Sequence, residues 1–133
     1  MIRSLALALM IAPAAAAQTL DAAGFNAYVA GKTLTFALPD GTTFGTEAYG
    51  TDRSVLWSTT PGSCQQGQWF ERDGLICFTY TTDPAPKCWT VTRTDRGLRA
   101  ESTGGTVLFE ATEAPQPLVC PGPELLSRLE LLP

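Results

Sequence analysis

Apolar and polar residues alternate at every second position over much of the chain after residue 33. A period of two is typical of a β-strand that buries one face, so each alternating group predicts one strand. The residues that we expect on the buried faces are Leu34, Phe36 and Leu38; Phe44, Thr46 and Ala48; Val55 and Trp57; Gly67 and Trp69; Ile76, Phe78 and Tyr80; Trp89 and Val91; Val107 and Phe109.

Clusters of Gly, Pro and Asp separate these groups. They lie at residues 39–41, 50–53, 61–63, 72–74, 83–86, 95–97 and 103–105. Gly adopts positive φ, Pro fixes φ and Asp bonds its own backbone, so all three favour turns. Seven turns predict a mainly β fold, an antiparallel up-and-down meander of about eight strands. Such a meander can close into a small barrel, with an open sheet or a sandwich as the alternative.

Two short helices are expected to flank the strands. Residues 21–31 place Phe25, Tyr28 and Val29 on one face, with Asp21 as a candidate N-cap and Gly31 as a candidate C-cap. Residues 123–132 begin with Pro and Glu, which suit a first helical turn, and residues 113–117 predict an extended connector before them. Leucines also share one face of this second segment, at Leu125, Leu129 and Leu132.

The first 17 residues follow the pattern of a secretory signal peptide. Arg3 is followed by an apolar run over residues 5–11 and by small residues up to Ala17. The uncharged stretch of 14 residues is shorter than the roughly 18 to 20 that span a bilayer. We therefore expect cleavage near Ala17, one domain over residues 18–133 without a transmembrane segment, and a periplasmic or secreted location.

Composition excludes several kinds of function. The chain has 133 residues, a formal net charge of -4 and no histidine. This length is too short for two ordinary domains, and no basic patch favours nucleic acid. Without histidine the common nucleophilic triads cannot form, and no phosphate-binding or dinucleotide-binding motif is present. We expect no metal and no cofactor.

The four cysteines all follow the predicted signal peptide, which favours two disulfides. Their spacing lacks the paired pattern of zinc and redox motifs. Three pairings are possible, and we favour Cys64 with Cys88 and Cys77 with Cys120, because Cys64 and Cys88 are expected near the same end of neighbouring strands.

Aromatic residues are the best candidates for a binding site. Tyr49, Trp57 and Trp89 lie on separate predicted strands, and the mouth of a barrel could gather them into an apolar site with a few hydrogen-bonding groups. The alternative is that they only fill the core, because the interior of an eight-stranded barrel is just wide enough for side chains or for one small ligand.

A site with two carboxylates, as in glycoside hydrolases, is the remaining catalytic hypothesis. Its candidates are Glu47, Glu71, Glu101 and Glu110, each on a predicted strand. Glutamate on a strand is more often on the solvated face, so the sequence favours a protein that is not an enzyme.

The residues also carry a resemblance. The segments 25–36, 45–49, 53–57, 64–69 and 76–89 resemble a group of small exported proteins of alphaproteobacteria that have no characterised function. This resemblance implies a periplasmic location and supplies no catalytic residue, cofactor or substrate. The order of short helix, Gly-x-Thr-Leu strand, meander and second helix more distantly resembles the calycin architecture of lipocalins and of bacterial metalloprotease inhibitors.

Three functions follow as hypotheses. The first is binding of a small apolar or amphipathic ligand, or of an envelope component, in an aromatic mouth. The second is a protein-interaction module, such as an inhibitor of a secreted protease, because loops on a stapled β-scaffold often carry recognition. The third is the two-carboxylate hydrolase. The sequence leaves the oligomeric state open.

Overall fold

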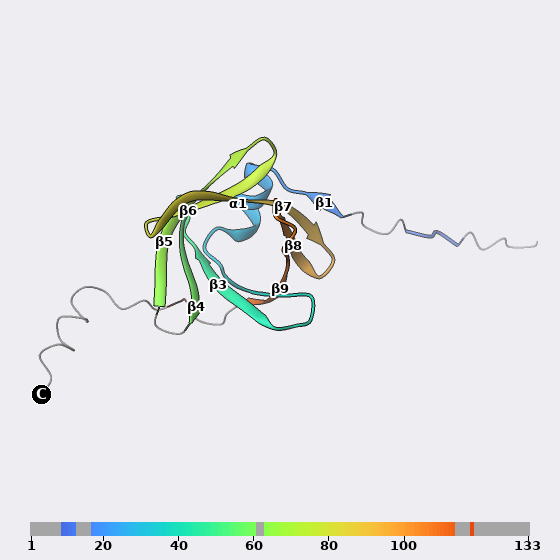
Figure 1. The fold of residues 1–133 in the computed structure, drawn as a ribbon. Coiled ribbons are helices and arrows are strands. Elements are labelled where there is room, and N and C mark those ends of the chain that lie inside the picture. The colour runs from blue at the N-terminus through green and yellow to red at the C-terminus, as the bar shows by residue number, and fades with distance from the viewer. Residues whose placement is uncertain (1–8, 13–16, 61–62, 114–117, 119–133) are drawn as a thin grey trace, which may run out of the picture.

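Eight antiparallel strands close into a barrel in the computed structural model, which describes residues 9–12, 17–60, 63–113 and 118 (Figure 1). Each strand pairs with its neighbours in sequence, and pairing of β2 with β9 closes the ring. The strands are β2 (Thr33–Ala37), β3 (Thr43–Tyr49), β4 (Ser54–Thr60), β5 (Ser63–Arg72), β6 (Leu75–Tyr80), β7 (Asp83–Thr94), β8 (Gly97–Ser102) and β9 (Val107–Glu113). The predicted up-and-down meander of eight strands is confirmed.

A further strand of two residues, β1 (Gln18–Thr19), was not expected from the sequence. It pairs with Arg93 and Thr92 of β7, beyond the part of β7 that pairs with β6. The chain therefore enters the fold along this otherwise uncovered edge of β7 and passes directly into the helix.

The single described helix, α1 (Ala22–Val29), lies across one end of the barrel (Figure 1). The predicted N-cap is confirmed, because the Asp21 side chain accepts a hydrogen bond from the Gly24 backbone N–H at 2.8 Å. The helix ends one residue before the predicted cap, at Ala30, and Gly31 then turns the chain with a φ of 78°. Phe25 and Val29 are fully buried, so α1 is part of the core.

Five of the seven predicted turns are found where the sequence places them. A sixth, at residues 61–63, lies partly outside the described residues. The β5–β6 turn is a tight one, because Asp73 and Gly74 both have positive φ, the geometry of a hairpin turn of two residues. The predicted turn at residues 83–86 is wrong. The chain reverses at Thr81 and Thr82 instead, and residues 83–86 begin β7.

The two prolines explain why this segment is mistaken for a turn. Pro84 and Pro86 lie where the pairing of β6 with β7 shifts register, between the pairs Phe78–Lys87 and Tyr80–Asp83. A bulge tolerates proline because the missing backbone N–H is not needed by the ladder there.

The inward face of β3 also differs from the sequence expectation. The alternation suggested Phe44, Thr46 and Ala48. Phe44 does line the cavity, but beyond it the buried positions are Gly45, Glu47 and Tyr49 instead of Thr46 and Ala48. The pairing of β2 with β3 shifts register between Phe36 and Ala37, and a shift of one residue exchanges the two faces of a strand.

The disulfide pattern corrects the favoured pairing. Cys77 and Cys88 are bonded to each other, directly opposite on β6 and β7 with their Cα atoms 4.0 Å apart. Both point away from the barrel interior, because their neighbours Ile76, Phe78 and Trp89 alternate with them. The expected bonds from Cys64 to Cys88 and from Cys77 to Cys120 are therefore wrong. Cys64 is also disulfide-bonded, whereas Cys120 lies outside the described residues.

The predicted helix at 123–132, most of the connector and most of the predicted signal peptide also lie outside the described residues. In the described part of the chain, no helix is long and apolar enough to cross a bilayer.

The Cys77–Cys88 bond can be tested by tryptic mapping without reduction. Trypsin cuts after Arg72, Lys87 and Arg93, so we expect peptide 73–87 to remain linked to peptide 88–93. The linked mass should separate into the two peptides on reduction. Recovery of peptide 73–87 linked to a peptide that contains Cys64 or Cys120 would contradict this bond.

Candidate ligand cavity

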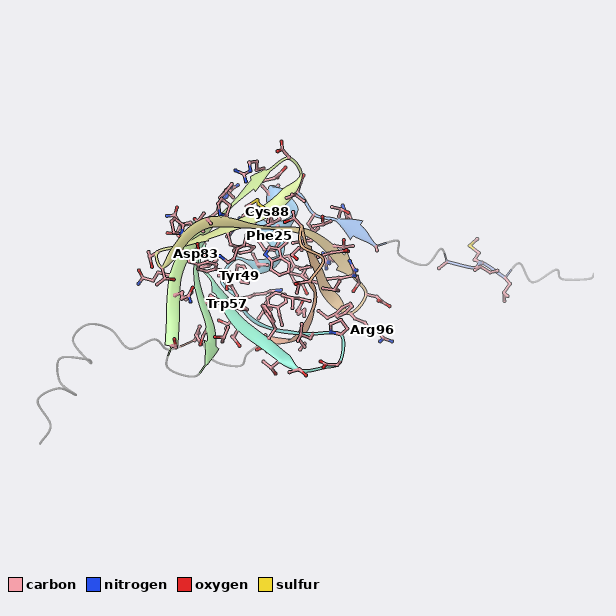
Figure 2. All side chains as sticks on the ribbon, in the orientation of Figure 1. Phe25, Tyr49, Trp57, Asp83, Cys88 and Arg96 are labelled. Atoms are coloured by element: carbon pink, nitrogen blue, oxygen red, sulfur yellow. A yellow bond between two sulfur atoms is a disulfide. The ribbon has the colours of Figure 1, made fainter. Side chains whose placement is uncertain are left out.

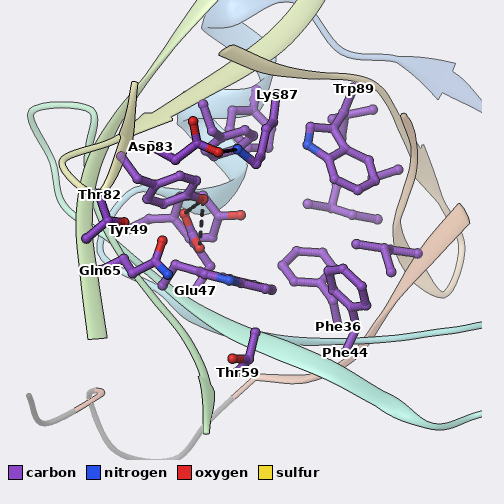
Figure 3. Close-up of a pocket in the computed structure, with 18 residues that line it drawn as sticks. Phe36, Phe44, Glu47, Tyr49, Thr59, Gln65, Thr82, Asp83, Lys87 and Trp89 are labelled. Atoms are coloured by element: carbon purple, nitrogen blue, oxygen red, sulfur yellow. Dashed lines mark hydrogen bonds and ion pairs between the residues drawn. The ribbon is translucent and has the colours of Figure 1, made fainter. Parts of the chain in front are cut away.

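The barrel interior contains a cavity of about 530 Å³ (Figure 3). This volume falls within the range of about 300–1,000 Å³ that is usual for small-molecule sites. The cavity is lined mostly by apolar and aromatic side chains, with a few polar groups. The lining residues are Phe25, Phe36, Phe44, Glu47, Tyr49, Trp57, Thr59, Gln65, Phe78, Tyr80, Thr82, Asp83, Lys87, Trp89, Val91, Leu98, Ala100 and Leu108.

Phe25 of α1 closes one end of this cavity. Its ring makes edge contacts with Trp69 at 4.9 Å, with Tyr49 at 5.7 Å and with Phe78 at 6.3 Å, measured between ring centroids. Edge-to-face packing is the favoured geometry of aromatic pairs. These four residues form an aromatic cluster at this end of the barrel. Phe25, Tyr49 and Phe78 line the cavity as its floor, whereas Trp69 packs against Phe25 without lining the cavity.

The other lining residues include an exposed rim. Thr59, Thr82 and Asp83 are exposed and come from the ends of β4 and β6–β7. Lys87 is exposed as well and forms an ion pair with Asp83, which lies four residues earlier at the start of β7. This partner and the Ala85 backbone N–H hold the pKa of Asp83 below its ordinary value.

The three predicted binding residues all line this one cavity. Trp57 and Trp89 are half-buried, as expected for residues of its upper walls, and Trp57 also packs on Phe44 with ring centroids 5.8 Å apart. Tyr49 is instead buried against the Phe25 floor and is not at a mouth. Figure 2 shows Phe25, Tyr49 and Trp57 within the barrel, whereas Asp83, Cys88 and Arg96 lie around it.

The central polar group of the cavity is Glu47, which the sequence offered only as a candidate catalytic carboxylate and not as a binding residue. This side chain is 2% exposed and lines the cavity, on the face of β3 that the alternation had assigned to solvent. The Tyr80 hydroxyl donates to its two carboxylate oxygens, at 3.1 and 3.4 Å (Figure 3). Burial raises the pKa of Glu47 well above its ordinary value of 4.5, and the Tyr80 hydrogen bond offsets part of this effect. One residue of the sequence could have revealed the burial of Glu47. Tyr49 is a large aromatic residue two positions later, so the two side chains lie on the same face of β3.

Two glycines make room for the residues around Glu47. A Cβ on Gly67 would lie 2.3 Å from the Thr79 carbonyl oxygen and 2.7 Å from the Tyr80 ring, so the ring lies directly over this glycine. A Cβ on Gly45 would lie 2.3 Å from the Trp57 ring. The absence of side chains at these positions lets Tyr80 reach across the sheet and lets Trp57 lie beside Glu47, its register partner.

The other three candidate glutamates have structural contacts. Glu71 accepts a hydrogen bond from the Ala22 backbone N–H and so caps α1 from β5. Glu110 accepts from the Tyr28 hydroxyl and from the Leu98 backbone N–H, both at 2.8 Å. Glu101 is exposed and pairs with Arg99. Glu47 is therefore the only one of the four that lines the cavity.

Among the described residues, no group of three or more Cys, Asp or Glu side chains is arranged to hold a metal ion. Comparisons with protein-family models, with curated proteins and with solved structures give no match. The observed class is thus a closed antiparallel barrel of eight strands, compatible with the calycin architecture. The resemblance to small exported alphaproteobacterial proteins gains no support from these comparisons.

Substitution of Gly67 by Ala should weaken the fold, because the new methyl group meets a backbone oxygen that cannot rotate away. We expect the free energy of unfolding in urea to fall by about 1–3 kcal/mol. The control is Gly104→Ala, where the nearest atom is the Ser102 hydroxyl at 3.8 Å and the change should stay within about 0.5 kcal/mol. Equal effects of the two substitutions would show that Gly67 is not a site of close approach.

Glu47 should make stability depend on pH. Between pH 4.5 and the raised pKa, folded Glu47 retains a proton that the unfolded chain loses, so its contribution to stability is complete below pH 4.5 and is lost as the pH rises. The difference in unfolding free energy between wild type and Glu47→Gln should therefore fall as the pH rises above 4.5 towards the raised pKa. The exposed carboxyls with lowered pKa are present in both proteins and cancel. A difference independent of pH would show that Glu47 is not buried as described.

Proposed function

We propose that this chain is an exported protein that binds a small amphipathic molecule inside its barrel. The observation that carries the proposal is the open cavity of about 530 Å³, which combines aromatic walls with one buried hydrogen-bonded carboxyl. A core evolved only for stability is packed without space of this size, because empty volume costs contacts.

The two sides of the cavity differ in chemistry. In the view of Figure 3, Trp89, Phe36 and Phe44 lie along one side, and the polar residues Glu47, Gln65 and Asp83 lie along the other. An amphipathic ligand can bury its apolar body on the first side and satisfy the polar groups of the second. Hydrolysis by a glutamate pair would need two carboxylates in the cavity, and only one of the four candidates lines it. Binding is therefore better supported than hydrolysis.

Export is proposed from the charged, apolar and small-residue segments of the first 17 residues. Two observations support a location in the periplasm or outside the cell. The Cys77–Cys88 disulfide fits an oxidising compartment. The sheet also begins at Gln18, the residue that cleavage near Ala17 would make the first.

Ligand binding can be tested with N-phenylnaphthylamine, an apolar fluorophore that is uncharged at neutral pH. We expect its fluorescence to rise on binding to the wild type, and we expect Trp57→Ala and Trp89→Ala each to weaken its affinity about tenfold. The reason is that these half-buried rings line the cavity walls, so their loss should reduce binding more than folding.

Trp69→Phe is the matched control for these variants. Trp69 is 2% exposed and packs against Phe25, but it does not line the cavity. We expect this substitution to lower stability by about 1–3 kcal/mol while the affinity for the fluorophore stays within about twofold. Absence of binding to the wild type would overturn the proposal. If Trp57→Ala and Trp89→Ala lose binding and stability in parallel, these residues only fill the core and are not binding residues.

The natural ligand can be sought by native mass spectrometry of protein purified from its own compartment. A mass present in the native spectrum and lost on denaturation would be the bound molecule. The same denatured sample would show whether the chain begins at Gln18.

A further inference from the structure

We infer that the molecule bound in this barrel is an organic amine, with an apolar or aromatic body and a protonated nitrogen that pairs with Glu47. This inference rests on the proposed function and names the chemical class of the ligand. It depends on the position of Glu47, on the charges around the cavity and on the rings beside the carboxyl.

Glu47 has acceptor capacity that no described residue uses. A carboxylate offers about four lone-pair sites, and the Tyr80 hydroxyl can donate only one proton to its two oxygens. A buried ionisable group with few partners is costly unless a second group compensates it. An ammonium ion donates up to three hydrogen bonds and carries the opposite charge, so its binding favours release of the Glu47 proton to solvent and formation of an ion pair inside the cavity.

The residues that line the cavity do not supply this charge. Lys87 is the one cation among them, and it is at the exposed rim in an ion pair with Asp83. Other described cations lie over rings elsewhere: Lys32 and Arg93 over Tyr28, and Arg53 over Trp69. The cavity therefore favours a positive ligand, whereas a carboxylate would meet Glu47 inside and Asp83 at the rim.

The aromatic walls favour the same class of ligand. Trp57 is the register partner of Glu47 on the neighbouring strand, so both side chains project from adjacent positions on the inner face. Tyr80 and Tyr49 lie near the same carboxyl. Burial raises the pKa of each tyrosine, and the nearby Glu47 carboxylate adds to this effect. Aromatic faces attract ammonium groups, most strongly where water is excluded, and they also pack against an apolar body.

The test compares three indole compounds that differ in the end of a short side chain: tryptamine, a cation; tryptophol, a neutral alcohol; and indoleacetate, an anion. Affinities are measured at neutral pH by calorimetry on the disulfide-bonded protein. We expect tryptamine to bind about tenfold to a hundredfold more tightly than tryptophol, as for a hydrogen bond to a charged partner, and indoleacetate to bind most weakly.

Glu47→Gln keeps an acceptor for Tyr80 but removes the charge, so it should abolish the preference for tryptamine and leave tryptophol binding within about twofold. The matched control is Glu101→Gln, the same chemical change at an exposed ion pair on the barrel surface, which should leave the preference unchanged. Glu47→Leu is a second variant with an apolar side chain of similar size, should the amide disturb folding.

The outcomes separate the two proposals. If the wild type binds N-phenylnaphthylamine but shows no preference for tryptamine over tryptophol, ligand binding stands and the amine inference is overturned. A preference that survives in both Glu47 variants also overturns it. If neither the fluorophore nor any indole compound binds, the proposed function fails as well.

Discussion

The aromatic cluster at the floor of the barrel determines what the rest of the structure can do. Phe25 enters from α1 and contacts Trp69, Tyr49 and Phe78, which come from three different strands. An eight-stranded barrel has an interior that side chains can fill or that one small ligand can occupy. Because the helix fills one end, the strands can leave the other end open without exposing the core to water from both sides.

The contacts that hold α1 explain the roles of two of the candidate glutamates. Glu71 caps the first turn from β5, and Glu110 accepts from Tyr28 in the last turn. These two bonds tie both ends of the helix to the barrel, and the Asp21 cap stabilises its first turn locally, although a helix of eight residues is marginal by itself. Glu47 makes no such contact with α1. Its burial in the cavity is thus not explained by support of the helix, which is why it is the residue with the strongest functional interpretation.

The sequence predicted the barrel well because turn residues and alternation are local signals. The prediction failed where a shift in strand register interrupted the alternation. At β3 the shift beside Ala37 exchanged the faces, which hid Glu47 on the presumed solvent side. At β7 the bulge accommodates two prolines, which favour a turn in the sequence. Because the turn was predicted too late in the chain, Cys88 was not expected opposite its true partner, Cys77. The alternation alone puts both cysteines on the outer face, and the reversal at Thr81–Thr82 together with the bulge brings them opposite each other. The contact of Tyr80 with Glu47 spans three strand positions, and no pattern in a single sequence encodes it.

Closure of the barrel joins distant parts of the chain. Leu34 of β2 pairs with Glu113 of β9, the final described strand, so every other strand must form between them. Until β9 arrives, β2 presents an edge of unpaired N–H and C=O groups, and such edges recruit other chains. Contacts of this sequence separation also form slowly. A chain that emerges from its N-terminus therefore cannot close the barrel before β9 is available, and the edge of β2 stays open to other chains until β9 docks.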